Sequence, residues 1–372
     1  MLSIYVHIPF CRKKCNYCAF NSKVGDESEI ENYVDALIKE ISLTTDHFPL
    51  STIYIGGGTP TVLKISQLEK IFRALEKKFN FDSKTEITIE ANPGTVDKNF
   101  LHDLKKIGFN RLSIGGQSFD DKILKILGRI HDSKTAVETV ETAKKFFDNI
   151  SVDLMYALPE QKFSDLKNSV ELAATLDVQH ISIYGLEIEE GTNFYKLRAE
   201  KKLNLPDDET CEKMYNFIVE KLHALGFERY EISNFAKKNF ESRHNLGYWT
   251  GRKYFGFGAG AHSYNEKIRT SNICNVADYT KKIFAGESVS EVEEIVTKKV
   301  AMEEFCFLGL RTAAGISAEK FFEKFGENIF DVYEKVIEKN ISLGLLKNLG
   351  DRIFLTERGM KFGNIVFADF LM

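Results

Sequence analysis

The chain has 372 residues, 43% of them hydrophobic, and a formal net charge of −4. We expect one large domain and a smaller one, each with its own core. The slightly acidic balance excludes a general affinity for nucleic acid or anionic membranes. No apolar run reaches the ~20 residues that span a bilayer, and the N-terminal order of apolar and basic residues is the reverse of a signal peptide. We therefore expect a cytoplasmic protein whose thiols stay reduced.

Short β-branched and aromatic runs alternate with amphipathic helical patterns through the first half of the chain. The predicted strands are residues 3–8, 52–55, 86–90, 111–114, 151–154 and 180–184. The predicted helices between them are residues 29–43, 65–79, 97–107, 120–127, 134–147 and 163–176. Such alternation is typical of βαβ units around a parallel sheet. Six units predict an α/β fold of the partial, open (β/α)6 barrel type, with a flavodoxin-like open sheet as the alternative.

The pattern changes after about residue 205. We expect a helix over residues 203–225, a strand over 230–235 and then a tract rich in glycine and aromatic residues. From about residue 291 helices dominate, and a short hairpin near 352–356 completes a winged-helix-like arrangement. Acidic residues outnumber basic ones there, so we expect this part to cover the barrel mouth or contact a partner, not DNA. The predicted domains are residues 1–205, 206–290 (a barrel-completing segment) and 291–372.

Three cysteines, Cys11, Cys15 and Cys18, lie within eight residues of one another. Three thiolates can hold a four-iron cluster and leave one iron open for a small molecule. The spacing would also suit one face of a buried helix, but Pro9 and the charged neighbours disfavour that alternative. Structural zinc normally takes four ligands, and the remaining cysteines are isolated. An iron–sulfur site is the best interpretation of this cluster.

Glycine and polar residues collect where the predicted strands end. In parallel α/β folds the carboxyl ends of the strands form the active-site face. The residues at these ends are the three cysteines, the run 56–60, Glu90, Asn92, Gln117, Asp153, Tyr184 and Gly185. So many coincidences on one rim are hard to explain by packing, and they predict a single site there.

The cysteine spacing, with Tyr17 before the last cysteine, resembles the signature of the radical S-adenosylmethionine (SAM) superfamily. More narrowly, the chain resembles the oxygen-independent coproporphyrinogen III dehydrogenase (HemN-like) family and its heme-chaperone relatives, the HemW subfamily. The motifs that carry this resemblance are residues 5–11, 56–60, 90–93, 113–119, 127–131 and 152–156. The resemblance covers nearly the whole chain and implies a radical SAM barrel with a HemN-type C-terminal domain.

The resemblance implies that Cys11, Cys15 and Cys18 hold a [4Fe–4S] cluster whose open iron is chelated by SAM. One electron from such a cluster can cleave a carbon–sulfur bond of SAM. The residues that the resemblance assigns to SAM are Tyr5, Gly57, Gly58, Thr59, Glu90, Gln117, Arg129, Asp153 and Gly185. A structural role is the alternative for several of them, such as a tight turn for the glycines and a solvated cation for Arg129.

Two features separate the subfamilies. The dehydrogenases carry a fourth cysteine two residues after the third, where this chain has Phe20. Residues 244–249 match the HNxxYW motif associated with the heme-binding relatives. Imidazole and phenolate can ligate heme iron and aromatic rings can stack on a porphyrin, so His244, Tyr248 and Trp249 are candidate heme contacts. The alternative is an aromatic loop in which His244 is hydrogen-bonded internally.

We therefore expect a heme chaperone that binds heme, a [4Fe–4S] cluster and SAM, and that delivers heme to an acceptor such as a respiratory heme protein. The alternatives are a coproporphyrinogen III dehydrogenase, a heme-modifying methyltransferase or heme-degrading relative, and a simple electron-transfer protein. A flavodoxin or ferredoxin as electron donor, a peripheral membrane contact through the acceptor and a homodimer are further expectations. No catalytic residue is assigned, and the sequence leaves open whether the protein is an enzyme.

Overall fold

The computed structural model describes residues 2–44 and 49–371. Within these residues, six parallel strands pair in sequential order at the centre of a 12-stranded sheet. They are β1 (Leu2–Ile8), β2 (Leu50–Gly57), β3 (Glu86–Ala91), β4 (Arg111–Gln117), β5 (Ile150–Tyr156) and β6 (His180–Gly185). The first and last of them pair with other strands and not with each other, so the barrel is open. This order confirms the partial (β/α)6 barrel and contradicts the flavodoxin-like alternative, in which the second strand lies at the edge.

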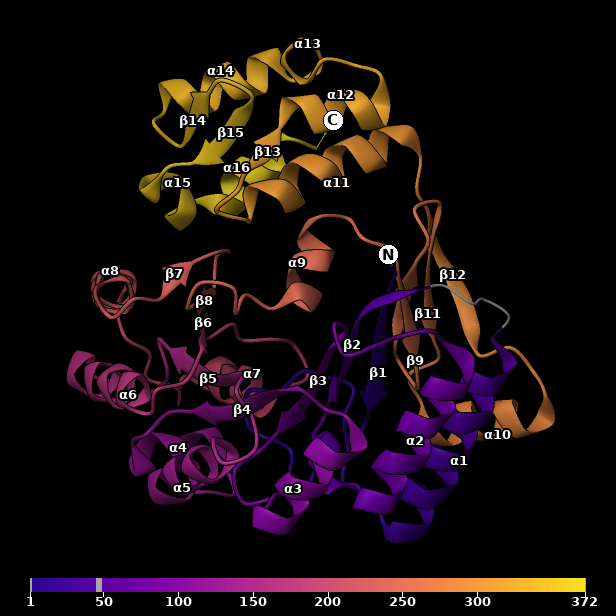
Figure 1. The fold of residues 1–372 in the computed structure, drawn as a ribbon. Helices are drawn as coiled ribbons and strands as arrows, with labels where there is room; N and C mark the ends of the chain where they lie inside the picture. Colours follow the sequence, from indigo (N-terminus) through magenta and orange to yellow (C-terminus); the bar gives the residue numbers. More distant parts are fainter. Residues whose placement is uncertain (1, 45–48, 372) are drawn as a thin grey trace.

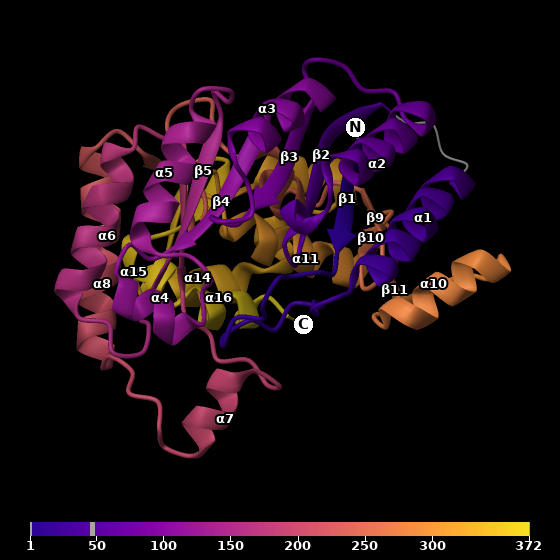
Figure 2. The same cartoon turned by 90° about the horizontal axis from the view of Figure 1, so that it is seen from below.

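Helices cover the outer face of these strands (Figure 2). They are α1 (Glu27–Leu43), α2 (Ile65–Lys78), α3 (Lys98–Ile107), α4 (Asp121–Leu127), α5 (Ser133–Ala143) and α6 (Phe163–Thr175). An aspartate caps four of these helices by accepting a hydrogen bond from a backbone N–H of the first turn. Apolar side chains on both faces of the strands are buried against the helices and the barrel interior.

The segment after β6 adds strands at both edges of the barrel sheet. Its helices are α7 (Asn193–Ala199), α8 (Asp208–Ala224), α9 (Arg243–Trp249) and α10 (Val276–Ala285). Its strands are β7 (Glu228–Arg229), β8 (Asn234–Ala236), β9 (Tyr254–Phe257), β10 (His262–Tyr264), β11 (Ile268–Asn272) and β12 (Ser290–Ile295). Strand β8 pairs antiparallel with β6, and β9 pairs parallel with β1.

Three predictions for this segment need correction. The helix expected from residue 203 begins at Asp208, because Asp207 caps its first turn and Pro206 precedes the cap. The strand expected over 230–235 begins only at Asn234, in β8, since residues 230–233 form the connection between β7 and β8. The short helix α7 was not predicted. All three differences lie where the chain lacks a long periodic pattern.

The C-terminal unit lies above the barrel, with α9 between the two (Figure 1). Its helices are α11 (Lys298–Leu310), α12 (Ala318–Phe325), α13 (Ile329–Val332), α14 (Glu334–Ser342), α15 (Glu357–Lys361) and α16 (Gly363–Asp369). Its strands β13 (Ile316–Ser317), β14 (Leu346–Leu349) and β15 (Arg352–Leu355) form a small sheet in the order β13-β15-β14. This arrangement, with a core of its own, confirms the predicted mainly helical domain. The predicted boundary at residue 291 lies inside β12, and the domain limits stay predictions.

One absence also bears on the fold. Across residues 2–44 and 49–371, no helix has both the length and the apolar character that crossing a bilayer requires.

Candidate functional site

A cavity of about 360 Å³ opens at the carboxyl ends of the parallel strands, and we call it the central cavity. Segments that are far apart in the sequence contribute to its wall. The predicted site residues that line it are Cys11, Cys15, Cys18, Gly57, Gly58, Thr59, Glu90, Gln117, Arg129 and Asp153. The barrel topology therefore brings together most of the residues that the sequence singled out at strand ends.

The three cysteines lie on a loop that follows β1, the cysteine loop (residues 9–23). The loop is pinned at both ends by backbone hydrogen bonds, from Cys11 N to Lys23 O and from Lys23 N to Pro9 O, each 2.9 Å. In its middle, Asn16 N donates to Leu127 O at 3.0 Å, which ties the loop to the end of α4. All three thiols are partly exposed. The loop is thus held in one conformation with its sulfur atoms at the cavity wall.

Two glycines at the end of β2 let the strand approach this loop. A Cβ atom on Gly58 would lie 2.6 Å from Phe10 O and 3.0 Å from Cys11 Sγ. Gly57 has a φ of +113°, and a Cβ there would lie 2.6 Å from the His7 ring. Close packing on the cysteine loop accounts for both glycines, and their contact with SAM stays a prediction.

The guanidinium group of Arg129 lies inside the central cavity beside the cysteine loop. Its Nη1 donates to Cys15 Sγ at 3.3 Å and its Nη2 to Gly115 O at 2.6 Å, and Nη2 also contacts Asn92. Its Nε is buried and has no hydrogen-bond partner among the described residues. A buried unpaired donor costs about 1–3 kcal/mol. This position excludes a solvated surface cation and suits an anionic ligand group.

Two carboxyl groups, those of Glu90 and Asp153, also line the central cavity. Glu90 accepts hydrogen bonds from the Tyr54 hydroxyl at 2.7 Å and from Gly57 N at 3.1 Å. Burial, with a smaller contribution from the charge of Asp153, raises the pKa of Glu90 to about 7. Asp153 accepts from the Ser113 hydroxyl at 3.1 Å, and burial raises its pKa as well. These carboxyls can therefore respond to a cationic or hydroxyl-bearing ligand by ionising.

Gln117 has a strained backbone at the cavity wall. Its φ is +66°, which is uncommon for a residue with a side chain, and the pairing of β4 with β5 shifts register between Gly115 and Gln117. Such bulges re-aim side chains and concentrate at functional sites. The end of β4 is thus shaped to turn Gln117 into the cavity.

Sequence reasoning missed several residues that also line the cavity. They are Tyr54, Arg111, Ser113 and Ser182. Asn92 and Tyr184, which the sequence placed at strand ends, line the cavity as well. Arg111 is 2% exposed and its Nε has no hydrogen-bond partner in the described part of the chain. A charged residue at the start of a strand suggests a position at the protein surface. The sequence therefore did not indicate that Arg111 faces the cavity. The available signal was a period-2 run of polar residues, 111 and 113, 151 and 153, and 180, 182 and 184, which marks inward-facing positions of a barrel.

The chain matches known families over almost its full length. The radical SAM superfamily model matches residues 5–173, and the HemN C-terminal domain model matches residues 296–362. The heme chaperone HemW of Bacillus subtilis (strain 168) is 40% identical, across 100% of this chain and 99% of that protein. The heme chaperone HemW of Lactococcus lactis subsp. lactis (strain IL1403) is 38% identical, across 100% and 97%. The chain belongs to the HemW family of radical SAM proteins.

A solved structure shares the fold of this HemW family member. The coproporphyrinogen III oxidase (HemN) from Escherichia coli aligns with a TM-score of 0.87 and 22% identity, across 100% of this chain and 90% of that one. Identity this low supports the fold and not the activity. The predicted assignment to the HemN-like family, HemW subfamily, is confirmed by the full-length relatives.

The cysteine loop fits the cluster that the radical SAM family implies. Among the described residues, no three His, Cys, Asp or Glu side chains converge as they would on a single metal ion. Three thiols spread along one loop suit a cluster, in which each sulfur ligates a different iron. Burial raises the pKa of Cys11 and Cys18, so binding iron would release their protons. When bound, such a cluster supplies one electron and an open coordination site.

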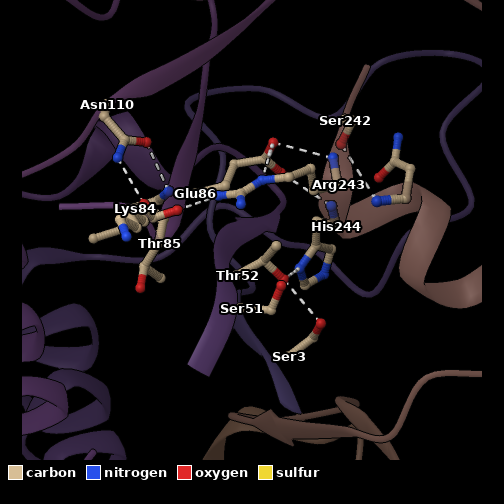
Figure 3. A network of polar contacts seen from close by, with 12 residues as sticks. Ser3, Ser51, Thr52, Lys84, Thr85, Glu86, Asn110, Ser242, Arg243 and His244 are labelled. Atoms are coloured by element: carbon tan, nitrogen blue, oxygen red, sulfur yellow. Dashed lines mark hydrogen bonds and ion pairs between the residues drawn. The ribbon is translucent and has the colours of Figure 1, made fainter. Parts of the chain in front are cut away.

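The HNxxYW motif lies in α9, and Figure 3 shows the ring of His244 beside Thr52 and the start of the helix beside Glu86. His244 Nδ1 lies 2.8 Å from the Thr52 hydroxyl, and Nε2 lies 3.0 Å from the Tyr248 hydroxyl. The backbone N–H groups of Arg243 and His244 both donate to the Glu86 carboxylate at 3.0 Å. Burial lowers the pKa of His244 to about 3, so its ring stays neutral. Iron ligation by His244 would require breaking one of these bonds.

We call this cluster the α9 network, formed by Ser3, Thr52, Glu86, Arg243, His244 and Tyr248. It gathers at the amino-terminal parts of β1, β2 and β3, whereas the cysteines follow the carboxyl end of β1. The ring of Trp249 points elsewhere, under the Arg311 guanidinium at 4.7 Å, in a pocket shared with the C-terminal unit. The three predicted heme contacts of the motif therefore do not converge on one point.

Two predicted SAM contacts lie outside the central cavity. The Tyr5 hydroxyl is hydrogen-bonded to His7 Nδ1 at 2.9 Å. Gly185 ends β6 and packs on Tyr156, to whose ring a Cβ would approach within 3.2 Å. Their contact with SAM stays a prediction.

Proposed function

We propose that this protein is a heme chaperone that binds heme, holds a [4Fe–4S] cluster through Cys11, Cys15 and Cys18, binds SAM in the central cavity and passes heme to an acceptor protein. The observation that carries the proposal is the match to proteins named heme chaperones across the full length of both chains. A match of that extent includes both domains and the connecting segment.

The chemistry of the central cavity supports the SAM part of the proposal. Arg129, with its buried unpaired Nε, can pair with the carboxylate of SAM. Glu90 can ionise against a cationic or ribose group, and Gln117 and Asp153 offer further polar contacts. All of these residues bind or orient, and none is positioned as a nucleophile.

Phe20 favours the chaperone over the dehydrogenase. This side chain, 68% exposed, occupies the place where the resemblance puts the fourth cysteine of the dehydrogenases. The exposed apolar ring on the cysteine loop is available for contact with an apolar cargo or partner. The acceptor, the electron donor, a dimer and a membrane contact through the acceptor stay proposals that rest on the family alone.

The test combines two anaerobic measurements on the reconstituted full-length protein. With SAM, a reductant and coproporphyrinogen III, we expect no protoporphyrinogen IX. With heme, we expect a saturable shift of the Soret band at one heme per chain. Formation of protoporphyrinogen IX would contradict the chaperone proposal in favour of the dehydrogenase, and a heme titration without any Soret shift would contradict heme binding.

A further inference from the structure

A second pocket lies beside the central cavity, at the seam where β9 pairs with β1, and we call it the lateral pocket. Its volume is about 480 Å³, within the range of ~300–1,000 Å³ that is usual for small-molecule sites. Gly57 and Glu90 line both cavities, so the two are adjacent. Phe20 also lines both cavities, and Tyr5, a predicted SAM contact, lines the lateral pocket.

Three histidines lie at or near this pocket, and their ring nitrogens differ in availability. Both nitrogens of His7 are occupied, by the Tyr5 hydroxyl at 2.9 Å and by Asn21 O at 2.8 Å. Both nitrogens of His244 are occupied in the α9 network. His262 is bonded only through Nδ1, and its Nε2 has no hydrogen-bond partner in residues 2–44 and 49–371. His262 is therefore the one of the three with a ring nitrogen available to a ligand.

The partner of His262 sets the tautomer that a metal requires. Nδ1 of His262 lies 3.0 Å from Oε2 of Glu293. A carboxylate can only accept, so Nδ1 carries the proton and Nε2 presents its lone pair. A carboxylate behind the imidazole is the arrangement that orients metal-ligating histidines and makes them more basic.

A β-bulge brings Glu293 to that position. Arg269 pairs with Glu294 and Thr270 with Val292, so Glu293 is the extra residue of β12 with no partner on β11. A bulge bends the strand and re-aims the side chain of the extra residue.

Aromatic side chains form part of the remaining wall of the lateral pocket, beside Asn21, Glu90 and Cys274. Tyr248 and Tyr254 pack edge to face with ring centroids 4.8 Å apart, and the exposed Phe20 forms the rim on the side of the cysteine loop. Aromatic walls of this kind suit a large planar apolar ligand. The HNxxYW motif thus reaches the pocket through Tyr248, while His244 secures the helix that carries it.

We propose that the lateral pocket binds an iron porphyrin, with Nε2 of His262 as an axial ligand of the iron and Glu293 as its positioning residue. The lone pair of Nε2 forms a coordinate bond to the iron and displaces a water or hydroxide ligand, and no electron is transferred. This assignment rests on the proposed heme binding and names the site that carries it.

The experiment is a titration of the anaerobically reconstituted full-length protein with ferric heme, followed by absorption and magnetic circular dichroism. For His262→Ala we expect loss of the histidine-ligated spectrum and affinity at least about 100-fold weaker, with the spectrum restored by added imidazole. For Glu293→Gln we expect the histidine spectrum to remain while affinity falls about 10-fold. His102→Ala, an exposed histidine on α3, is the matched control and should leave both unchanged.

The heme titration distinguishes a failure of the His262 site from a failure of the proposed heme binding. If the wild type shows no Soret shift, both fail. If the wild type binds heme and His262→Ala keeps the same spectrum and affinity, the inference fails while the chaperone proposal stands. A thiolate-type spectrum that disappears in Cys274→Ser, the exposed thiol of the same pocket, would also overturn the role of His262. Unchanged melting temperatures of the variants would exclude misfolding as the cause.

Discussion

The central cavity and the α9 network both gather buried polar side chains, but only the cavity leaves some of them unpaired. In the cavity, Nε of Arg111 and Nε of Arg129 have no partner among the described residues. In the α9 network, both nitrogens of His244 have hydrogen-bond partners. Both oxygens of Glu86 accept from backbone N–H groups (Figure 3). A satisfied buried network stabilises a fold, whereas unpaired donors mark a place for a ligand. The difference teaches that burial and residue type alone do not identify a binding site.

The largest effect should come from the cysteine loop. For Cys15→Ser we expect complete loss of the iron–sulfur cluster, because two thiolates cannot hold it. Iron and sulfide content and visible absorption after anaerobic reconstitution provide the measurement. Cys211→Ser, a partly buried cysteine on α8, should keep the full cluster. A normal iron content in Cys15→Ser would refute the ligand assignment.

A substitution in the α9 network should mainly lower the stability of the folded protein. His244→Ala removes a fully buried ring and leaves the Thr52 and Tyr248 hydroxyls without their partner, so we expect the free energy of unfolding to fall by about 2–4 kcal/mol. Urea denaturation of the full chain measures it. His102→Ala, on the surface of α3, should change it by less than about 0.5 kcal/mol. Wild-type stability together with lost heme binding in His244→Ala would show that this ring is a ligand after all.

The carboxyl group of Glu90 in the central cavity should make the free energy of unfolding depend on pH. The folded-state pKa of Glu90, about 7, is raised above its usual value of 4.5. The stabilisation from the protonated carboxyl is therefore complete below about pH 4.5 and is lost as the pH rises through about 7. Relative to Glu90→Gln, we expect the unfolding free energy of the wild type to fall across this window by at most about 3 kcal/mol. Parallel curves for the two proteins would contradict the raised pKa.

Replacement of Arg129 in the central cavity should weaken the binding of SAM. For Arg129→Gln we expect SAM binding to the reconstituted protein to lose about 1.5–3 kcal/mol, as for a hydrogen bond to a charged group. Calorimetric titration with SAM measures this loss. Arg12→Gln is the matched control, since Arg12 is an exposed arginine that donates to Gly94 O. Equal SAM affinity in both variants would remove Arg129 from the site.

The smallest effect should come from Phe20, at the rim between the two cavities. Because its ring is mostly exposed, Phe20→Ser should change the unfolding free energy by less than about 0.5 kcal/mol and keep the cluster. We expect heme affinity to fall by about 1–2 kcal/mol through lost apolar contact. Heme affinity equal to that of the wild type would mean that the rim does not touch the cargo.

Hydrophobic runs of four to eight residues are a strong sequence signal for strands, so the ends of the strands could be predicted. A parallel topology then brings the carboxyl ends of these strands to one edge of the sheet. The sequence therefore predicts that Glu90, Gln117 and Asp153 share one site, and all three line the central cavity. Sequence reasoning missed Arg111, since a charge at the start of a strand resembles a surface residue. It could not separate a ligand histidine from a structural one, because the difference between His244 and His262 lies in hydrogen-bond partners that come from distant strands. Residues 230–233 were mistaken for a strand because short aromatic runs do not reveal turns.

The most direct test of this account is the heme titration of Cys15→Ser beside the wild type, since the account separates the heme site from the cluster site. We predict one heme per chain in both proteins, the same Soret maximum and dissociation constants within about 3-fold, a difference under ~0.7 kcal/mol. Loss of heme binding together with the cluster would contradict the account and place the heme in the central cavity.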